Sequence, residues 1–127
     1  MEAVLRPFDL GATQWYVLYH LAQDGPTMQR ELLRTLQIER ATLSAVVGAM
    51  VRKGLVEQVP DRADQRQKQL RLTKAGTKLW HSLPDLTDVI HAAAFEGIDA
   101  GDLAVAARVL RIATERLDKL SPKKADV

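Results

Sequence analysis

The sequence contains no cysteine, and this absence excludes several kinds of chemistry at once. Disulfide bonds, thiol redox sensing and cysteine-ligated zinc or iron–sulfur sites all need cysteine side chains. The chain also lacks any apolar run near the roughly 18 residues that a membrane span requires, and it shows no charged and then apolar leader. We therefore expect a soluble, cytoplasmic protein without membrane contacts.

The sequence has little that would support catalysis. Its seven glycines are dispersed, so none of them builds a loop that could cradle a phosphate group. No nucleophile and base, and no carboxylate pair in a cleft, can be recognised. Asp61 and Asp64 fall in a charged segment whose composition is typical of a turn. We therefore expect neither enzyme activity nor a cofactor.

Two histidine–aspartate pairs stand at helical spacing, which is the one hint of a metal site. His81 with Asp85, and Asp88 with His91, are each close enough along a helix to hold an ion together. Pro84 disturbs this geometry, and no established metal motif surrounds the pairs. Surface contacts between neighbouring helical turns are the alternative interpretation, and we expect no metal.

Positive charge is concentrated in one block of the chain. The net charge of the 127-residue sequence is only +2. By segment, it is −2 for residues 1–27, +5 for 28–76 and −1 for 77–127. A basic block between acidic flanks is typical of a surface that binds a polyanion. A solvated face with a chance bias of charge is the alternative.

A chain of this length is the usual size of a single domain, for which one core would be enough. Residues 10–22 follow a helical apolar pattern, and Asp24-Gly25-Pro26 ends it as a turn. Thr27 is then in position to cap a second helix over residues 28–36. Two short helices that are joined by a tight turn within a basic block predict a helix-turn-helix.

A third helix and a hairpin follow. The helix covers residues 39–53, and Gly54 ends it at a position that favours a left-handed residue. Residues 55–59 and 69–73 have strand patterns, and turn-forming residues lie between them. A hairpin next to a helix-turn-helix predicts the winged form of the motif, so the fold class is mainly α with a small β-hairpin wing.

The C-terminal part is predicted to be helical and to form a dimerisation region. A helix from residue 73 to about 95 should be kinked or broken at Pro84. From 102 to 120, apolar residues recur every seven positions and form a seam typical of helix pairing. The seam is Leu103, Leu110 and Leu117 with Ala106, Ala113 and Leu120, and a second stripe is Val105, Val109 and Ile112. We expect a homodimer; a monomer whose helix is buried on two sides is the alternative. Residues 121–127 should form a flexible tail.

The third helix has two contrasting faces. Leu43, Val46, Val47 and Met50 share one face at about 100° per residue. The opposite face carries the small residues Ala41, Ala45, Gly48 and Ala49. Small residues would let the helix backbone lie deep in a DNA major groove about 12 Å wide. Gly48 costs the helix roughly 1 kcal/mol relative to alanine, which favours a close approach there.

Base contacts are expected from the first turn of this helix, where Arg40, Thr42 and Ser44 flank the small face. Arg40 can donate two hydrogen bonds to guanine. A phosphate contact, or a pair with Glu39, is the alternative for Arg40.

Phosphate contacts are expected around the helix pair. Helix N-termini bind phosphate oxygens through free amide groups, so Thr27 and Gln29 are candidates. Further basic candidates are Arg52, Lys53 and Lys68, and each of them would otherwise be an ordinary surface residue.

With these residues placed, the sequence resembles the MarR family of winged helix-turn-helix transcriptional regulators. The segments that carry the resemblance are LGATQWYVLYHL, VRKGLVEQ, DQRQKQLRLTKAG and, more weakly, FEGIDAGDLAVAARVLRIATERL. The most specific element is Asp64-x-Arg66 followed by Leu72-Thr73-x-x-Gly76, which is similar to the family's wing and its exit. Where family members often have arginine, this chain has Ala45 and Gln58.

The resemblance implies a function and a division of the chain. Residues 10–76 would be the DNA-binding domain and 77–120 the dimerisation region, after a shortened N-terminal segment, 1–9. The homodimer would bind a pseudo-palindromic site on double-stranded DNA, as a repressor that a small aromatic or phenolic effector releases. Arg66 would enter the minor groove, where narrow A/T-rich geometry favours arginine. Asp64 would orient the wing through a salt bridge, and Arg62 belongs to the same basic tip.

Two questions stay open at this point. Trp15, Tyr19, His20, Trp80 and His81 are candidates for an effector pocket, although aromatic residues at helical spacing are more often part of a core. The rival function is a dimeric protein-interaction or antirepressor module without DNA binding. Such a module should carry large apolar anchors on the third helix, where this chain has small residues.

Overall fold

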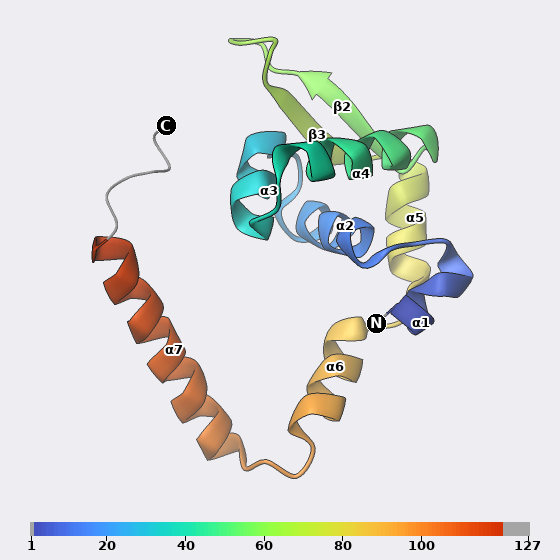
Figure 1. The fold of residues 1–127 in the computed structure, drawn as a ribbon. Helices are drawn as coiled ribbons and strands as arrows, with labels where there is room; N and C mark the ends of the chain where they lie inside the picture. Colours follow the sequence, from blue (N-terminus) through green and yellow to red (C-terminus); the bar gives the residue numbers. More distant parts are fainter. Residues whose placement is uncertain (1, 121–127) are drawn as a thin grey trace. The chain divides into compact units, whose positions relative to one another are not determined.

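The computed structural model describes residues 2–120, and the expected tail at 121–127 lies outside this range. The chain divides into two compact units, one up to Pro84 and one from Asp85 onward. The first contains α1 to α5 and all three strands, and the second contains α6 and α7 (Figure 1).

The first unit begins with a short helix and a 3₁₀ turn that lead into α2. Helix α1 is Glu2–Leu5, the turn is Arg6–Phe8 and α2 is Ala12–Asp24. Gly11 caps α2 in extended conformation, and its backbone N–H donates to Gln14 Oε1. Leu5, Val17 and Leu18 are fully buried. The N-terminal segment therefore contributes to the core of the first unit.

Helices α3 (Gln29–Leu36) and α4 (Arg40–Arg52) form the predicted helix-turn-helix. Leu32 of α3 and Leu43, Val47 and Met50 of α4 are buried, which confirms the apolar face expected for the third helix. Gly54 has a φ of 77°, the left-handed conformation expected where α4 ends.

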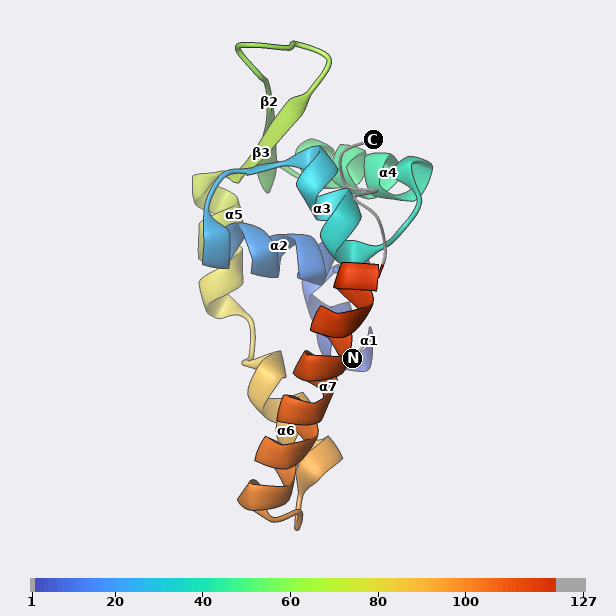
Figure 2. The same cartoon turned by 90° about the vertical axis from the view of Figure 1, so that its left-hand side faces the viewer.

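The sheet has three antiparallel strands in the order β1-β3-β2. Strands β2 (Val56–Pro60) and β3 (Lys68–Leu72) form the hairpin, with Val56 opposite Leu72 and Pro60 opposite Lys68. The hairpin extends away from the helices in both views (Figures 1 and 2). Leu70 is fully buried and anchors the hairpin to the core, so the predicted winged fold is confirmed.

The prediction that Thr27 caps the second helix is wrong. Thr27 and Met28 form strand β1, in which Thr27 lies opposite Leu70 and Met28 opposite Gln69. Met28 precedes α3 as its cap residue and makes no side-chain cap bond. Thr27 Oγ1 instead donates to the carbonyl of Gly25 at 2.9 Å. Pairing with the hairpin thus replaces capping at this residue.

The exit from the wing is tightly packed. Thr73 caps α5 (Lys74–Ser82) by accepting from the N–H of Gly76 at 3.0 Å, and its hydroxyl donates to the carbonyl of Gly54. A Cβ at Gly76 would lie 2.1 Å from the carbonyl oxygen of Leu55. Only glycine fits there without a backbone shift, which gives the Leu72-Thr73-x-x-Gly76 pattern a physical cause.

The second unit consists of α6 (Leu86–Phe95) and α7 (Ala100–Leu120). The predicted long helix is broken rather than kinked, since α5 ends at Ser82 and α6 begins after Pro84. No residue of α7 is buried, and its large aliphatic side chains are exposed, with Leu110 at 68% and Leu117 at 66%. Among the described helices, none combines the length and hydropathy of a membrane span.

Candidate nucleic-acid interface

Helix α4 turns its small face outward because its large face is held in the core. Leu43, Val47 and Met50 are at most 1% exposed, so the rotation of the helix about its axis is fixed. Ala41 and Ala45 on the other side are exposed, and Gly48 is half-buried. The middle of this outer face is therefore shallow and made of small residues, which permits a close approach to a DNA groove.

Three polar candidates lie at the start of this face. Arg40 is the first residue of α4, and Arg40, Thr42 and Ser44 are all exposed. Glu39 caps the helix without a side-chain bond, and the structure shows no ion pair between Glu39 and Arg40. The Arg40 guanidinium is thus available for a ligand. At the far end of the face, Arg52 is exposed. Its side chain reaches back to Gly48, since a Cβ built on Gly48 would lie 3.4 Å from Arg52 Nη1.

The tip of the wing is built by two aspartates. Asp61 Oδ2 accepts from the backbone N–H groups of Ala63 and Asp64, both at 3.1 Å. Asp64 in turn accepts from Arg66, with Oδ1 at 3.0 Å from Nε and Oδ2 at 3.2 Å from Nη2. The expected salt bridge within the wing is therefore present. Arg62 is exposed at the same tip.

The salt bridge between Asp64 and Arg66 orients a cationic side chain that stays exposed to solvent. The Arg66 side chain is 88% exposed although it is paired. Hydrogen bonds from the side chain and the backbone of Arg66 hold the pKa of Asp64 below its ordinary value, and the charge of Arg30 lowers it further. The lowered pKa keeps Asp64 ionised, and thus paired with Arg66, to a more acidic pH than an isolated aspartate would allow.

A groove of about 290 Å³ lies between α3, α4 and the wing. It brings together five of the candidates from three separate stretches of the sequence, namely Gln29, Arg40, Ser44, Arg66 and Lys68. Sequence reasoning missed Arg30, Leu33, Leu43, Gln58 and Gln67 as further lining residues. Gln58 Nε2 donates to Gln29 Oε1 at 2.9 Å, which links β2 to the first turn of α3.

Lys53 lies outside this groove and already has partners. Its Nζ donates to the backbone carbonyl of Asp9 and to Gln14 Oε1 at 3.2 Å, and it lies 3.4 Å from Asp9 Oδ2. These contacts tie the end of α4 to the start of α2. A phosphate contact of Lys53 would have to compete with them.

Four of the five effector candidates form an aromatic cluster. Trp15 stacks on Tyr19 at a centroid distance of 5.4 Å and lies 5.7 Å from Trp80, and Tyr19 meets the edge of His20 at 5.3 Å. Trp15 is only 5% exposed. Among the described residues, its Nε1 is a buried side-chain donor without a hydrogen-bond partner.

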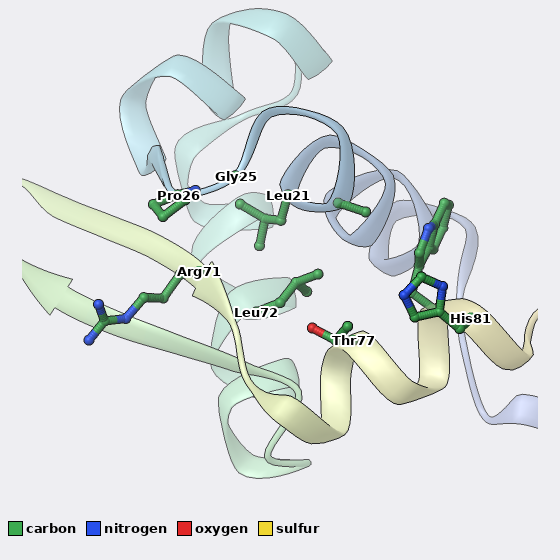
Figure 3. Close-up of a pocket in the computed structure, with 9 residues that line it drawn as sticks. Leu21, Gly25, Pro26, Arg71, Leu72, Thr77 and His81 are labelled. Atoms are coloured by element: carbon green, nitrogen blue, oxygen red, sulfur yellow. The ribbon is translucent and has the colours of Figure 1, made fainter.

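Trp80 and the fifth candidate, His81, line a cavity of about 360 Å³. Figure 3 shows this cavity between the end of α2, the end of β3 and α5, with Leu21, Leu72 and Thr77 around it. The guanidinium group of Arg71 points away from the cavity in this view, and Arg71 Nε donates to Glu57 Oε2 at 2.9 Å. The effector candidates thus divide between an aromatic cluster and a neighbouring pocket that share Trp80.

One member of each histidine–aspartate pair, Asp85 and His91, makes another contact. Asp85 caps α6 by accepting from the N–H of Asp88 at 3.1 Å, and the His91 ring meets the edge of Phe95 at 5.0 Å. Residues 2–120 contain no group of three or more side chains arranged to hold a metal ion.

Comparisons with known proteins agree with this geometry. A sequence profile of the MarR family matches residues 8–67. The HTH-type transcriptional repressor IacR of Pseudomonas putida is 26% identical over 120 residues, which are 94% of this chain and 72% of that protein.

Two solved structures share the fold. The PcaV transcriptional regulator from Streptomyces coelicolor, in complex with its natural ligand, is 25% identical with a TM-score of 0.70, over 84% of this chain and 75% of that one. A mutant of MarR from E. coli, complexed with operator DNA, is 24% identical with a TM-score of 0.74, over 87% of this chain and 80% of that one.

Proposed function

The chain belongs to the MarR family of DNA-binding transcriptional regulators, and from this premise we propose that it is a homodimeric, effector-responsive repressor of a pseudo-palindromic operator. The observation that carries the proposal is that the outer face of α4 consists of small residues and that the neighbouring wing exposes the Arg66 side chain to solvent. A regulatory rather than a catalytic role, in the cytoplasm, is part of the proposal.

The two DNA-facing elements have different tasks. Helix α4 enters the major groove, and Arg40 at its start donates to a base, where a good bidentate pair discriminates by about 1 to 3 kcal/mol. The wing follows the backbone into the adjacent minor groove, where Arg66 meets concentrated negative potential. Sequence specificity then comes mainly from α4, and the wing adds affinity and preference for A/T-rich flanks.

Helix α7 supports dimerisation. Its exposed leucines and valines form a continuous apolar surface that single chains rarely leave in water. In a homodimer with two-fold symmetry, two copies of α4 would meet half-sites about 34 Å apart. A protein-interaction module without DNA binding is less consistent with α4, whose outer face has no large apolar anchor.

The aromatic cluster supports an effector site. A buried donor without an acceptor is costly, by roughly 1 to 3 kcal/mol. The Nε1 of Trp15 is such a donor, and a phenolate or carboxylate oxygen of a small aromatic ligand would supply the acceptor. The similar protein PcaV was solved with a natural ligand, which is consistent with a ligand-binding role.

Salt-dependent DNA binding tests the main proposal. A labelled duplex is first selected from a randomised library by the wild-type protein, and its affinity is then measured at several salt concentrations. Each neutralised phosphate contributes about 0.9 to the slope of log affinity against log salt. We expect a steep slope because several cations line the α3–α4–wing groove. A flat slope, or failure to select any duplex, would contradict the proposal.

The effector is tested with tryptophan fluorescence. Trp15 and Trp80 are the only two tryptophans in the chain, so intrinsic emission reports on the cluster alone. We expect 4-hydroxybenzoate to quench this emission and to release the selected duplex, whereas cyclohexanecarboxylate, which is not aromatic, should do neither. If no phenolic acid alters emission or DNA binding, the effector part of the proposal is wrong.

A further inference from the structure

Arg30 is the one basic residue of the α3–α4–wing groove to which the sequence assigns no role. We infer that Arg30 is a phosphate contact. Together with Arg40, Arg66 and Lys68, it would place four cations along one DNA strand between α4 and the wing. This inference rests on the proposed DNA-binding function and names a residue that this function uses.

The position of Arg30 is set by three elements that converge. Arg30 is the second residue of α3, Arg40 the first of α4 and Lys68 the first of β3. The hydrogen bond between Gln58 and Gln29 joins β2 to α3 directly beside Arg30. All four cations line the same groove although they are up to 38 positions apart in the sequence.

The charge of the groove is not compensated by its own lining. None of the ten residues that line it, all within the described range, is acidic. Arg66 is paired with Asp64. Among residues 2–120, Arg30, Arg40 and Lys68 have no ion-pair partner. Three cations without an ion-pair partner around one groove favour an anion in it, and a DNA phosphate has the right charge.

The positive charge of Arg30 acts on Asp64 in the wing. Its charge contributes, after the hydrogen bonds from Arg66, to the lowered pKa of Asp64. Arg30 therefore acts in the same electrostatic environment as Arg66. A DNA strand that passes between α4 and the wing would come within reach of both guanidinium groups.

The test compares Arg30→Gln with Lys78→Gln, which removes the same charge from an exposed position on α5. Binding of the selected duplex, and of a scrambled duplex of equal length, is measured at several salt concentrations. We expect Arg30→Gln to lower affinity about tenfold on both duplexes and to reduce the salt slope by about one per protomer, with an unchanged melting temperature. Lys78→Gln should match the wild type, and Arg30→Lys should restore most of the slope.

The outcomes separate the inference from the function on which it rests. If the wild type binds with a steep slope and Arg30→Gln binds identically, Arg30 is no contact and only the inference is overturned. A loss confined to the selected duplex, with the slope unchanged, would make Arg30 a base contact and would also overturn it. If the wild type binds no duplex, the proposed function fails, and the inference fails with it.

Discussion

Two helices of this protein expose surfaces that are chemically opposite. The outer face of α4 carries Ala41, Ala45 and Gly48 and is flanked by cations. On α7, where no residue is buried, the apolar side carries bulky aliphatic side chains, with Leu110, Leu117 and Leu120 the most exposed.

The contrast indicates which kind of partner each face suits. A flat surface of small residues gains little from the hydrophobic effect, since it has little apolar area to bury. It does permit close approach to a polar, charged surface such as a DNA groove. A ridge of leucines gains several kcal/mol from burial and is suited to another ridge of the same kind. Substitutions that exchange the properties of the two faces therefore test the assignment directly.

The largest effect is expected from Leu110→Glu combined with Leu117→Glu. Burying one leucine contributes about 1.5 to 3 kcal/mol, and a homodimer would bury four of these side chains. We expect the dissociation constant of the dimer to rise by at least about 10⁴-fold, which corresponds to roughly 6 kcal/mol. Sedimentation equilibrium measures this constant. Arg108→Glu, on the opposite side of α7, is the control and should leave the dimer intact.

The same glutamate on α4 should leave the dimer intact and abolish DNA binding. Ala45→Glu places a negative charge and a longer side chain on the face that approaches DNA, and like charges brought together cost several kcal/mol. We expect a loss of affinity of more than about 100-fold with an unchanged sedimentation profile. If Ala45→Glu binds the selected duplex as tightly as the wild type does, α4 is not the helix that enters the major groove.

The contrast between the two helices was predictable because it follows from the spacing of apolar residues within each helix. The spacing of Leu43, Val47 and Met50 fixes which side of α4 is buried, and the structure confirms it. The seven-residue repeat of α7 predicts one apolar side in the same way. Pro84 marks the break between α5 and α6 because its ring cannot fit within a helix.

Features that depend on distant parts of the chain were not predictable. Thr27 looks like a helix cap, but pairing with Leu70 makes it part of a strand, and a two-residue strand has no periodicity to detect. Lys53 looks like a free cation, but the fold brings Asp9 to it from 44 positions away. Arg30 gains its place in the groove only when α3 and the wing are brought together.

An intermediate effect is expected from Arg66→Ala, which tests the wing against α4. The Arg66 side chain is exposed, and its ion pair is with Asp64 of the same wing, so its removal should not alter the melting temperature. We expect about a tenfold loss of affinity, or roughly 1.4 kcal/mol, on a duplex with A/T-rich flanks. The loss should be smaller with G/C-rich flanks, where the minor groove is less favourable for arginine.

Arg66→Lys is the matched control for the wing. Lysine keeps the charge but cannot form the two-pronged pair with Asp64. We expect its affinity to lie between those of the wild type and Arg66→Ala. Equal affinity of all three proteins would remove the wing from the mechanism.

The smallest effect, and the sharpest contrast between folding and function, is expected from Gly48→Ala. The added Cβ would meet only Arg52 Nη1 at 3.4 Å, which is ordinary contact distance, so the fold accommodates it. Because alanine favours a helix over glycine by about 0.8 to 1 kcal/mol, thermal unfolding should show a more stable protein. DNA binding should nevertheless weaken a few-fold, because the methyl group holds the helix away from the groove. Gly101→Ala, near the start of α7, should leave DNA binding unchanged. If Gly48→Ala stabilises the protein and binds DNA at least as tightly as the wild type, the glycine does not mark a close approach to DNA.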